Sequence, residues 1–113
     1  MNKEILYDHI KLCRDELLKE NEGKRFLIDD IEVALFKVGG EIYALGNICP
    51  HQHSALIYEG FIEEGCVICP LHGWKFQLKD GIMPSGNRGL ASYQVKVADG
   101  DVYVKILKKE MNW

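Results

Sequence analysis

Residues 47–76 read NICPHQHSALIYEGFIEEGCVICPLHGWKF and contain two short motifs that each pair a cysteine with a histidine. The first motif is Cys49-Pro50-His51, and the second is Cys69-Pro70-Leu71-His72. Proline fixes φ directly after each cysteine, and the glycine after the second histidine lets the backbone approach an inorganic centre closely. The two motifs therefore predict two loops that each offer one thiolate and one imidazole to a metal.

The segment between the motifs, Phe61–Ile68, has the pattern of a β-hairpin with a Glu64-Gly65 turn. A hairpin at this place would bring both loops to the same end of a sheet. Two cysteines and two histidines suit tetrahedral zinc, but zinc sites usually pair like ligands, whereas each loop here mixes the two kinds. The mixed set fits a Rieske-type [2Fe-2S] cluster, in which two thiolates bind one iron and two imidazoles bind the other.

With these motifs the chain resembles the Rieske family, and in particular the stand-alone ferredoxin components of bacterial ring-hydroxylating dioxygenases. The resemblance extends to strands expected at residues 32–38, 41–45, 95–97 and 102–104. It implies an all-β fold, an antiparallel β-sandwich or barrel in one domain over residues 1–113, with a cluster-binding subdomain at about 47–76. It also implies one [2Fe-2S] cluster, with Cys49 and Cys69 on the buried iron and His51 and His72 on the outer iron.

The ligand set and its neighbours bear on the reduction potential. Neutral imidazoles in place of two thiolates make a cluster less negative and easier to reduce. The high-potential members of the resembled family have an extra cysteine in each motif, forming a disulfide, and a serine after the glycine. The matching positions here are occupied by Ser54, Leu71 and Trp74. We therefore expect a potential at the low, ferredoxin-like end of the Rieske range.

The composition favours one compact domain, because 47% of the 113 residues are apolar and 27% are charged, unlike disordered chains. The net charge of −3 leaves no basic surface for nucleic acid. No apolar run approaches the roughly 20 residues that cross a bilayer, and the first residues show no export signal. We expect a cytoplasmic protein, without nucleic-acid or membrane partners, whose four cysteines form no disulfide framework.

Turn-forming dipeptides divide the rest of the chain into short strands. They are Asp29-Asp30, Gly39-Gly40, Glu64-Gly65, Asp80-Gly81 and Asp99-Gly100. Apolar and polar residues alternate over 93–97 and 101–106, which predicts half-buried antiparallel strands. The largely apolar strand at 33–38 is expected to be central, with both faces covered. Only residues 14–20 have helix-forming composition, and that segment is too short to be stable without packing.

Other cysteines and histidines have simpler interpretations. Cys13 and Cys66 lie in strand-like runs with no histidine at ligand spacing, so we expect them to pack as small apolar residues. His53 is also within ligand reach of Cys49, at a place where the resembled family often has glycine. We assign His51 as the ligand and expect His53 to be exposed beside the cluster.

Segments next to the motifs have their own expected roles. Trp74 and Phe76 alternate on one strand face, and we expect them to be core aromatics. Residues 81–87 resemble the third loop that covers the cluster in the family. Acidic residues between the motifs would steer a basic partner. They are Glu59, Glu63 and Glu64.

These features favour a one-electron carrier that passes electrons from a reductase to a terminal oxygenase or related enzyme, with no catalytic residues of its own. The sequence has no second metal motif, no dinucleotide-binding glycine pattern and no nucleophile constellation. Redox partners would dock transiently near His51 and His72. Two alternatives stay open: the small subunit of an NAD(P)H-dependent nitrite reductase, which has a similar fold, and a zinc-binding interaction module without redox function.

Overall fold

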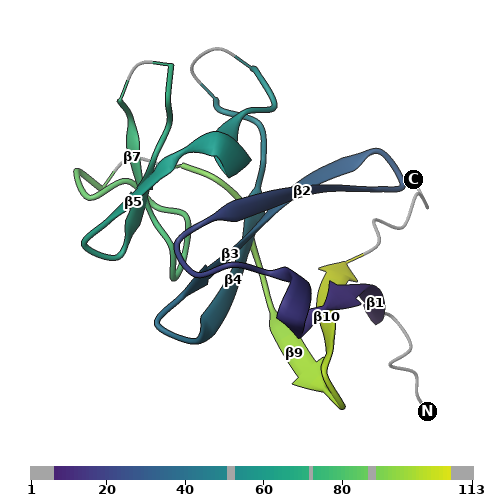
Figure 1. The fold of residues 1–113 in the computed structure, drawn as a ribbon. Helices are drawn as coiled ribbons and strands as arrows, with labels where there is room; N and C mark the ends of the chain where they lie inside the picture. Colours follow the sequence, from purple (N-terminus) through teal and green to yellow (C-terminus); the bar gives the residue numbers. More distant parts are fainter. Residues whose placement is uncertain (1–6, 51–52, 72, 87–88, 108–113) are drawn as a thin grey trace, which may run out of the picture.

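The computed structural model describes residues 7–50, 53–71, 73–86 and 89–107, which form three antiparallel sheets (Figure 1). The first sheet has the strand order β1-β10-β9, the second β2-β3-β4-β8 and the third β5-β6-β7. The bounds are β1 Tyr7–Arg14, β2 Gly23–Ile28, β3 Ile31–Val38, β4 Glu41–Gly46, β5 Phe61–Glu63, β6 Cys66–Ile68, β7 Lys75–Gln77, β8 Ser92–Tyr93, β9 Val95–Ala98 and β10 Asp101–Leu107. Short 3-10 turns lie at η2 Asp15–Leu17 and η3 Ile57–Glu59. The prediction of an all-β, antiparallel fold is confirmed.

Four of the five predicted turn dipeptides close two-residue hairpins. In each of these turns both residues have positive φ, for example 48° and 70° at Asp29-Asp30 and 53° and 81° at Asp99-Gly100. That pair of angles matches the right-handed twist of the flanking strands. The fifth dipeptide, Asp80-Gly81, follows β7 without a returning strand, and the Gly81 N–H donates to the Gln77 carbonyl at 2.7 Å. It opens a longer loop instead of a hairpin.

Strand β3 is covered on both faces, as the sequence predicts. Ala34 and Phe36 face one buried cluster, while Val33 and Leu35 face a second, and all four are fully buried. The second cluster also contains Val102, Val104 and Ile106 of β10, so it holds the sheet of both chain ends against the central sheet. The first cluster lies toward the β5-β6-β7 sheet and contains Cys49 and Cys69.

The helix-forming composition of residues 14–20 produces only the single turn η2. A segment of this length forms too few internal hydrogen bonds to be stable as an α-helix. Leu18, directly after η2, is buried in the second core, so tertiary packing fixes the segment in a different shape. No helix in the described ranges is long and apolar enough to cross a membrane.

Candidate metal centre

Two loops present the predicted cysteine ligands at one end of the molecule. Cys49 lies in the loop after β4, and Cys69 lies in the loop between β6 and β7, at the top of Figure 1. Both side chains are 1% exposed and belong to the same buried cluster. Neither is in a disulfide, so the fold brings two thiols from distant segments into one apolar environment.

The two loops close in the same way. In the first, the Cys49 N–H donates to the Ser54 carbonyl at 3.0 Å and the His53 N–H donates to the Cys49 carbonyl at 2.6 Å. In the second, the Cys69 N–H donates to the Trp74 carbonyl at 2.8 Å and the Gly73 N–H donates to the Cys69 carbonyl at 3.0 Å. Each cysteine is thus bonded to the residues four and five positions after it.

This likeness explains the unusual backbone of His53. His53 has a φ of 58°, and Gly73, at the equivalent place in the second loop, has a φ of 75°. Histidine is among the non-glycine residues that tolerate the left-handed region better than bulky or β-branched ones. His53 is exposed, as expected from the sequence.

The histidine ligands predicted with these cysteines, His51 and His72, lie outside the described residues. Within the described ranges, no three histidine, cysteine, aspartate or glutamate side chains form a metal-binding group. The structure therefore places the two sulfur ligands of the predicted set, and the two imidazoles stay a prediction.

The other two cysteines are integrated into the packing. Cys66 of β6 is buried, and Cys13 of β1 is half-buried against the second core, where burial raises the pKa of its thiol. Neither belongs to the buried cluster that contains Cys49 and Cys69. Both positions agree with the expectation that these residues pack as small apolar side chains.

The loop after β7 packs against the first core. Met83 is partly buried against the group of side chains that includes Cys49 and Cys69. The loop closes where the Leu90 N–H donates to the Gly81 carbonyl at 2.8 Å, and a Cβ on Gly81 or Gly89 would overlap the backbone of this closure. Both glycines are therefore needed for the close approach of these two backbone segments. The covering role over a metal centre remains a prediction.

The aromatic residues after the second motif are core residues. Phe76 is fully buried in the first cluster, and Trp74 is partly buried against it. Both were expected in the core, and both follow the loop of Cys69 directly. They therefore fix the exit of that loop by packing.

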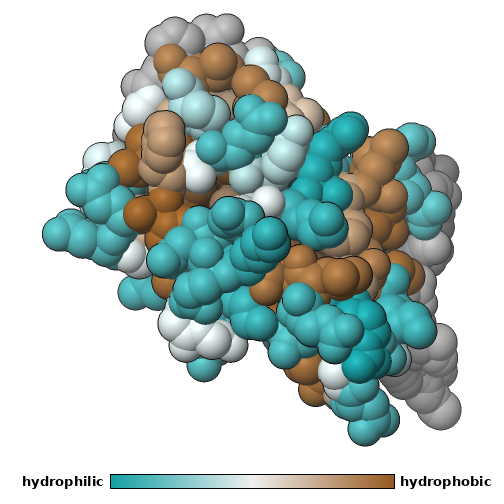
Figure 2. Space-filling model, viewed as in Figure 1, coloured by the Kyte–Doolittle hydropathy of each residue, from teal (hydrophilic) through white to brown (hydrophobic). Residues whose placement is uncertain are grey.

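The described residues of the two cysteine loops carry no Asp, Glu, Lys or Arg. This holds for segments 47–50, 53–58, 69–71 and 73–74. Pro50, Pro70 and Leu71 are exposed in these loops, and apolar side chains are visible at the top of Figure 2. Glu64, expected to steer partners, lies in the turn at the opposite end of β6 from Cys69. Ile82 lies toward that far end, because its carbonyl accepts from the Gln77 N–H at 3.0 Å, and Gln77 pairs with Cys66.

A polar network that runs from the surface to the buried Asn47, beside the first motif, was not predicted from the sequence. Asn47 is fully buried, and its Nδ2 donates to Glu32 Oε1 at 2.9 Å. Arg25 donates to both oxygens of the same carboxylate, at 2.8 and 2.5 Å. These bonds, that from Arg25 first, hold the pKa of Glu32 at about 2. The available signal was a lone asparagine directly before an apolar residue and the cysteine.

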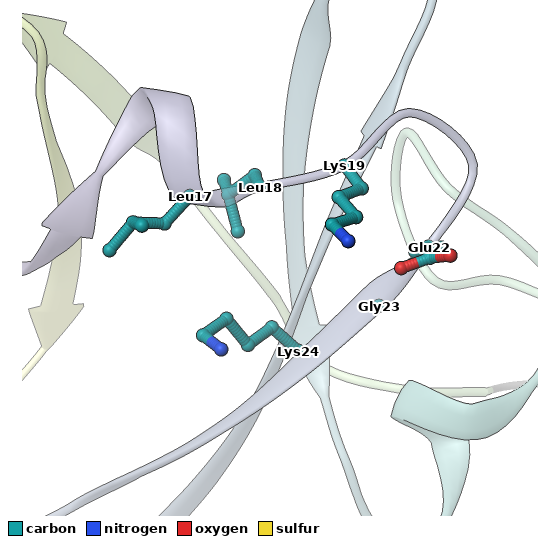
Figure 3. A pocket seen from close by; sticks show the side chains of 6 residues that line it. All are labelled: Leu17, Leu18, Lys19, Glu22, Gly23 and Lys24. Atoms are coloured by element: carbon teal, nitrogen blue, oxygen red, sulfur yellow. The ribbon is translucent and has the colours of Figure 1, made fainter.

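A small cavity elsewhere in the fold is unrelated to the cysteines. It has a volume of about 120 Å³ and is lined by Leu17, Leu18, Lys19, Glu22, Gly23 and Lys24 (Figure 3). Neither Cys49 nor Cys69 lines it. The cavity lies between the end of η2 and the start of β2. Gly23 is needed where β2 passes η3, because a Cβ there would overlap the Tyr58 carbonyl.

Comparison with known protein families gives a match over most of the chain. Residues 8–105 match the family described as the Rieske-like [2Fe-2S] domain. The 3-phenylpropionate/cinnamic acid dioxygenase ferredoxin subunit of Escherichia coli (strain K12) is 38% identical over 90 residues. That alignment covers 75% of this chain and 83% of the relative.

Solved structures share the fold. The structure described as the NADH-dependent nitrite reductase small subunit from Mycobacterium tuberculosis has a TM-score of 0.85 at 24% identity, covering 91% of this chain and 98% of that one. At that identity the likeness shows the fold alone. A chain of the complex of reduced oxygenase and oxidized ferredoxin in carbazole 1,9a-dioxygenase has a TM-score of 0.75 at 28% identity, covering 84% and 99%.

Proposed function

The chain belongs to the Rieske-like [2Fe-2S] domain family, and from this membership we propose that it is a one-electron carrier between a reductase and a terminal oxygenase or related enzyme. It is an electron-transfer component of a multicomponent system and not itself the enzyme. A bound [2Fe-2S] cluster supplies the one-electron chemistry. The observation that supports this most directly is the pair of buried thiols, neither of them in a disulfide, on two loops that close with the same pattern of backbone hydrogen bonds.

We propose Cys49, His51, Cys69 and His72 as the cluster ligands, with the cysteines on the inner iron. Burial of both thiols among apolar residues suits the inner position, because it keeps water from the sulfur ligands. The family match extends across both motifs. Imidazoles from the exposed side of the same loops would complete the set at the surface, where an electron can leave.

The exposed, uncharged residues of the two cysteine loops, Pro50, Pro70 and Leu71, form the proposed docking surface for both redox partners. Docking would remove these apolar side chains from water, which favours binding, and we expect a small, transient interface of under about 1,200 Å². The relative named above is a ferredoxin subunit of a dioxygenase, and a similar chain occurs in a complex of oxygenase and ferredoxin. We also propose that the chain is a single Rieske domain, in line with the family match over residues 8–105, and that it works in the cytoplasm.

A second candidate is the small subunit of a nitrite reductase, favoured by a solved structure described as a nitrite reductase NADPH small subunit, which is 27% identical with a TM-score of 0.79. The two functions use the same cluster and differ in the partner. Stable co-purification with a large reductase subunit would indicate the nitrite reductase, whereas turnover with separate reductase and oxygenase components would indicate the ferredoxin.

The test is the EPR spectrum of anaerobically purified protein before and after dithionite, together with iron and zinc analysis. We expect a signal only after reduction, with the low average g value that imidazole ligation produces. Cys69→Ala should lose the signal, and Cys66→Ala, a buried cysteine of the same sheet, is the matched control that should keep it. A colourless protein with stoichiometric zinc would refute the electron-carrier function and support the interaction module.

A further inference from the structure

The two ligand loops close alike but are anchored differently. The loop of Cys69 lies between β6 and β7, which are paired in register directly at its base, Ile68 opposite Lys75. The loop of Cys49 has no such ladder. It leaves β4 at Gly46 and returns through residues 55–58 into η3, which is no strand. Something other than strand pairing must hold its base together.

Asn47 occupies that base, and all of its polar groups are bonded. Its backbone N–H donates to the Glu32 carbonyl at 3.1 Å, and its carbonyl accepts from the Ile57 N–H at 3.2 Å. Its Nδ2 donates to the Glu32 carboxylate at 2.9 Å and to the Ala55 carbonyl at 3.2 Å. Its Oδ1 accepts from the Tyr58 N–H at 2.8 Å. One side chain therefore joins the entry of the loop, its exit and β3.

We propose that Asn47 is a positioning residue that holds the Cys49 loop in the shape required for cluster binding, in place of the β-ladder that holds the Cys69 loop. The inference rests on the proposed function, because it takes the shape that Asn47 holds to be the shape that binds the [2Fe-2S] cluster. Asn47 is the fully buried polar side chain among the described residues, so its hydrogen bonds are shielded from competition with water. Removing them leaves the Tyr58 N–H and the Ala55 carbonyl without this partner.

The first test compares iron release from Asn47→Ala and from the wild type. Reduced protein is mixed with an excess of bathophenanthroline, and release is followed by colour. We expect release from the variant to be at least about tenfold faster, because losing several buried hydrogen bonds favours loop opening by that factor or more. Val104→Ala is the matched control, since Val104 is also fully buried but belongs to the second core, away from the loop. Both variants are measured at equal intervals below their melting temperatures.

Two further variants separate the roles of the bonds. Asn47→Asp keeps the acceptor for the Tyr58 N–H but loses both donated bonds, so it should also release iron faster. Glu32→Gln keeps an oxygen that can accept from Asn47 Nδ2, so it should release iron at close to the wild-type rate. These variants also serve if Asn47→Ala does not fold.

Amide exchange in the metal-free protein gives a readout independent of the cluster. In Asn47→Ala the amides of Ile57 and Tyr58 should exchange faster, while those of the β6–β7 ladder keep their protection. Unchanged iron release with unchanged exchange would overturn the proposal. Equal acceleration in Val104→Ala would also overturn it, since global stability would then explain the effect. A wild-type protein without iron would refute the proposed function, and exchange would still decide whether Asn47 clamps the loop.

Discussion

Replacing Gly73 by alanine should measure the free energy that the left-handed backbone of this loop costs, separately from any side-chain clash. Gly73 has a φ of 75°, and a Cβ built on it meets no atom within 4 Å among the described residues. The substitution therefore adds no clash, and the change in stability comes from the left-handed backbone. Alanine in this region costs roughly 1–2 kcal/mol. The smaller entropy of the unfolded chain offsets about 0.4–1 kcal/mol of that cost.

The net expectation is a loss of about 1 kcal/mol, or roughly 4 °C in melting temperature for a domain of this size. His53→Gly is the complementary change, because His53 has the same turn conformation with a φ of 58°. It removes the left-handed cost but adds unfolded-state entropy, so its effect should lie between zero and a gain of about 1 kcal/mol. Thermal unfolding followed by circular dichroism measures both.

Two outcomes would refute this reasoning. An unchanged melting temperature in Gly73→Ala would show that the turn is not left-handed in the protein. A loss in His53→Gly as large as that in Gly73→Ala would show that the His53 side chain itself stabilises the loop. Iron stoichiometry and the EPR spectrum of His53→Gly should match the wild type, because His51 is the proposed ligand. Loss of iron would instead make His53 the ligand.

Three further predictions follow from single sites. The pKa of Glu32 is lowered from 4.5 to about 2, so its ion pair stabilises the fold above pH 4.5, and this contribution is lost as the pH falls through about 2; the melting-temperature difference between wild type and Glu32→Gln should vanish near that pH. Gly89→Ala should cost about 2–4 kcal/mol in chemical denaturation, well beyond Gly73→Ala, because a Cβ would overlap the Gly81 carbonyl and lie 2.9 Å from the Phe76 ring. Cys66→Ala should leave iron stoichiometry unchanged, and loss of iron would make Cys66 a ligand.

Most of the strand framework could be predicted from local signals. Asp99-Gly100 lies between residues of alternating polarity, and turn chemistry with alternation is enough to define a hairpin. The double-sided burial of Val33 to Phe36 was visible because a strand with both faces covered lacks alternation. Cys49 and Cys69 could be predicted to come together because each has a histidine at ligand spacing, and the fold places both in one buried group of side chains.

The remaining features depend on contacts between distant segments, which no local pattern shows. Asn47 bonds to Glu32, fifteen positions earlier, and to Tyr58, eleven positions later. Nothing in the composition around Glu32 indicates that its carboxylate faces inward. The Asp80-Gly81 dipeptide resembles a hairpin turn, but the segment after it pairs with no strand of the β7 sheet. In each case contacts with distant segments, and not the local sequence, decide which hydrogen bonds or turns form.

The division of the core gives the site its independence from the rest of the fold. Phe36, on one face of β3, packs in the first core together with both cysteines. Leu35, on the other face, packs in the second core with the strands of both chain ends. The side chains that pack around Cys49 and Cys69 are therefore separate from those that hold the sheet of both chain ends against the central sheet. Glu32 lies on the same strand and connects it to Asn47, so β3 is the common support of the second core and of the first ligand loop. β3 thus connects the first loop, which has no strand ladder of its own at its base, to the packing of the second core.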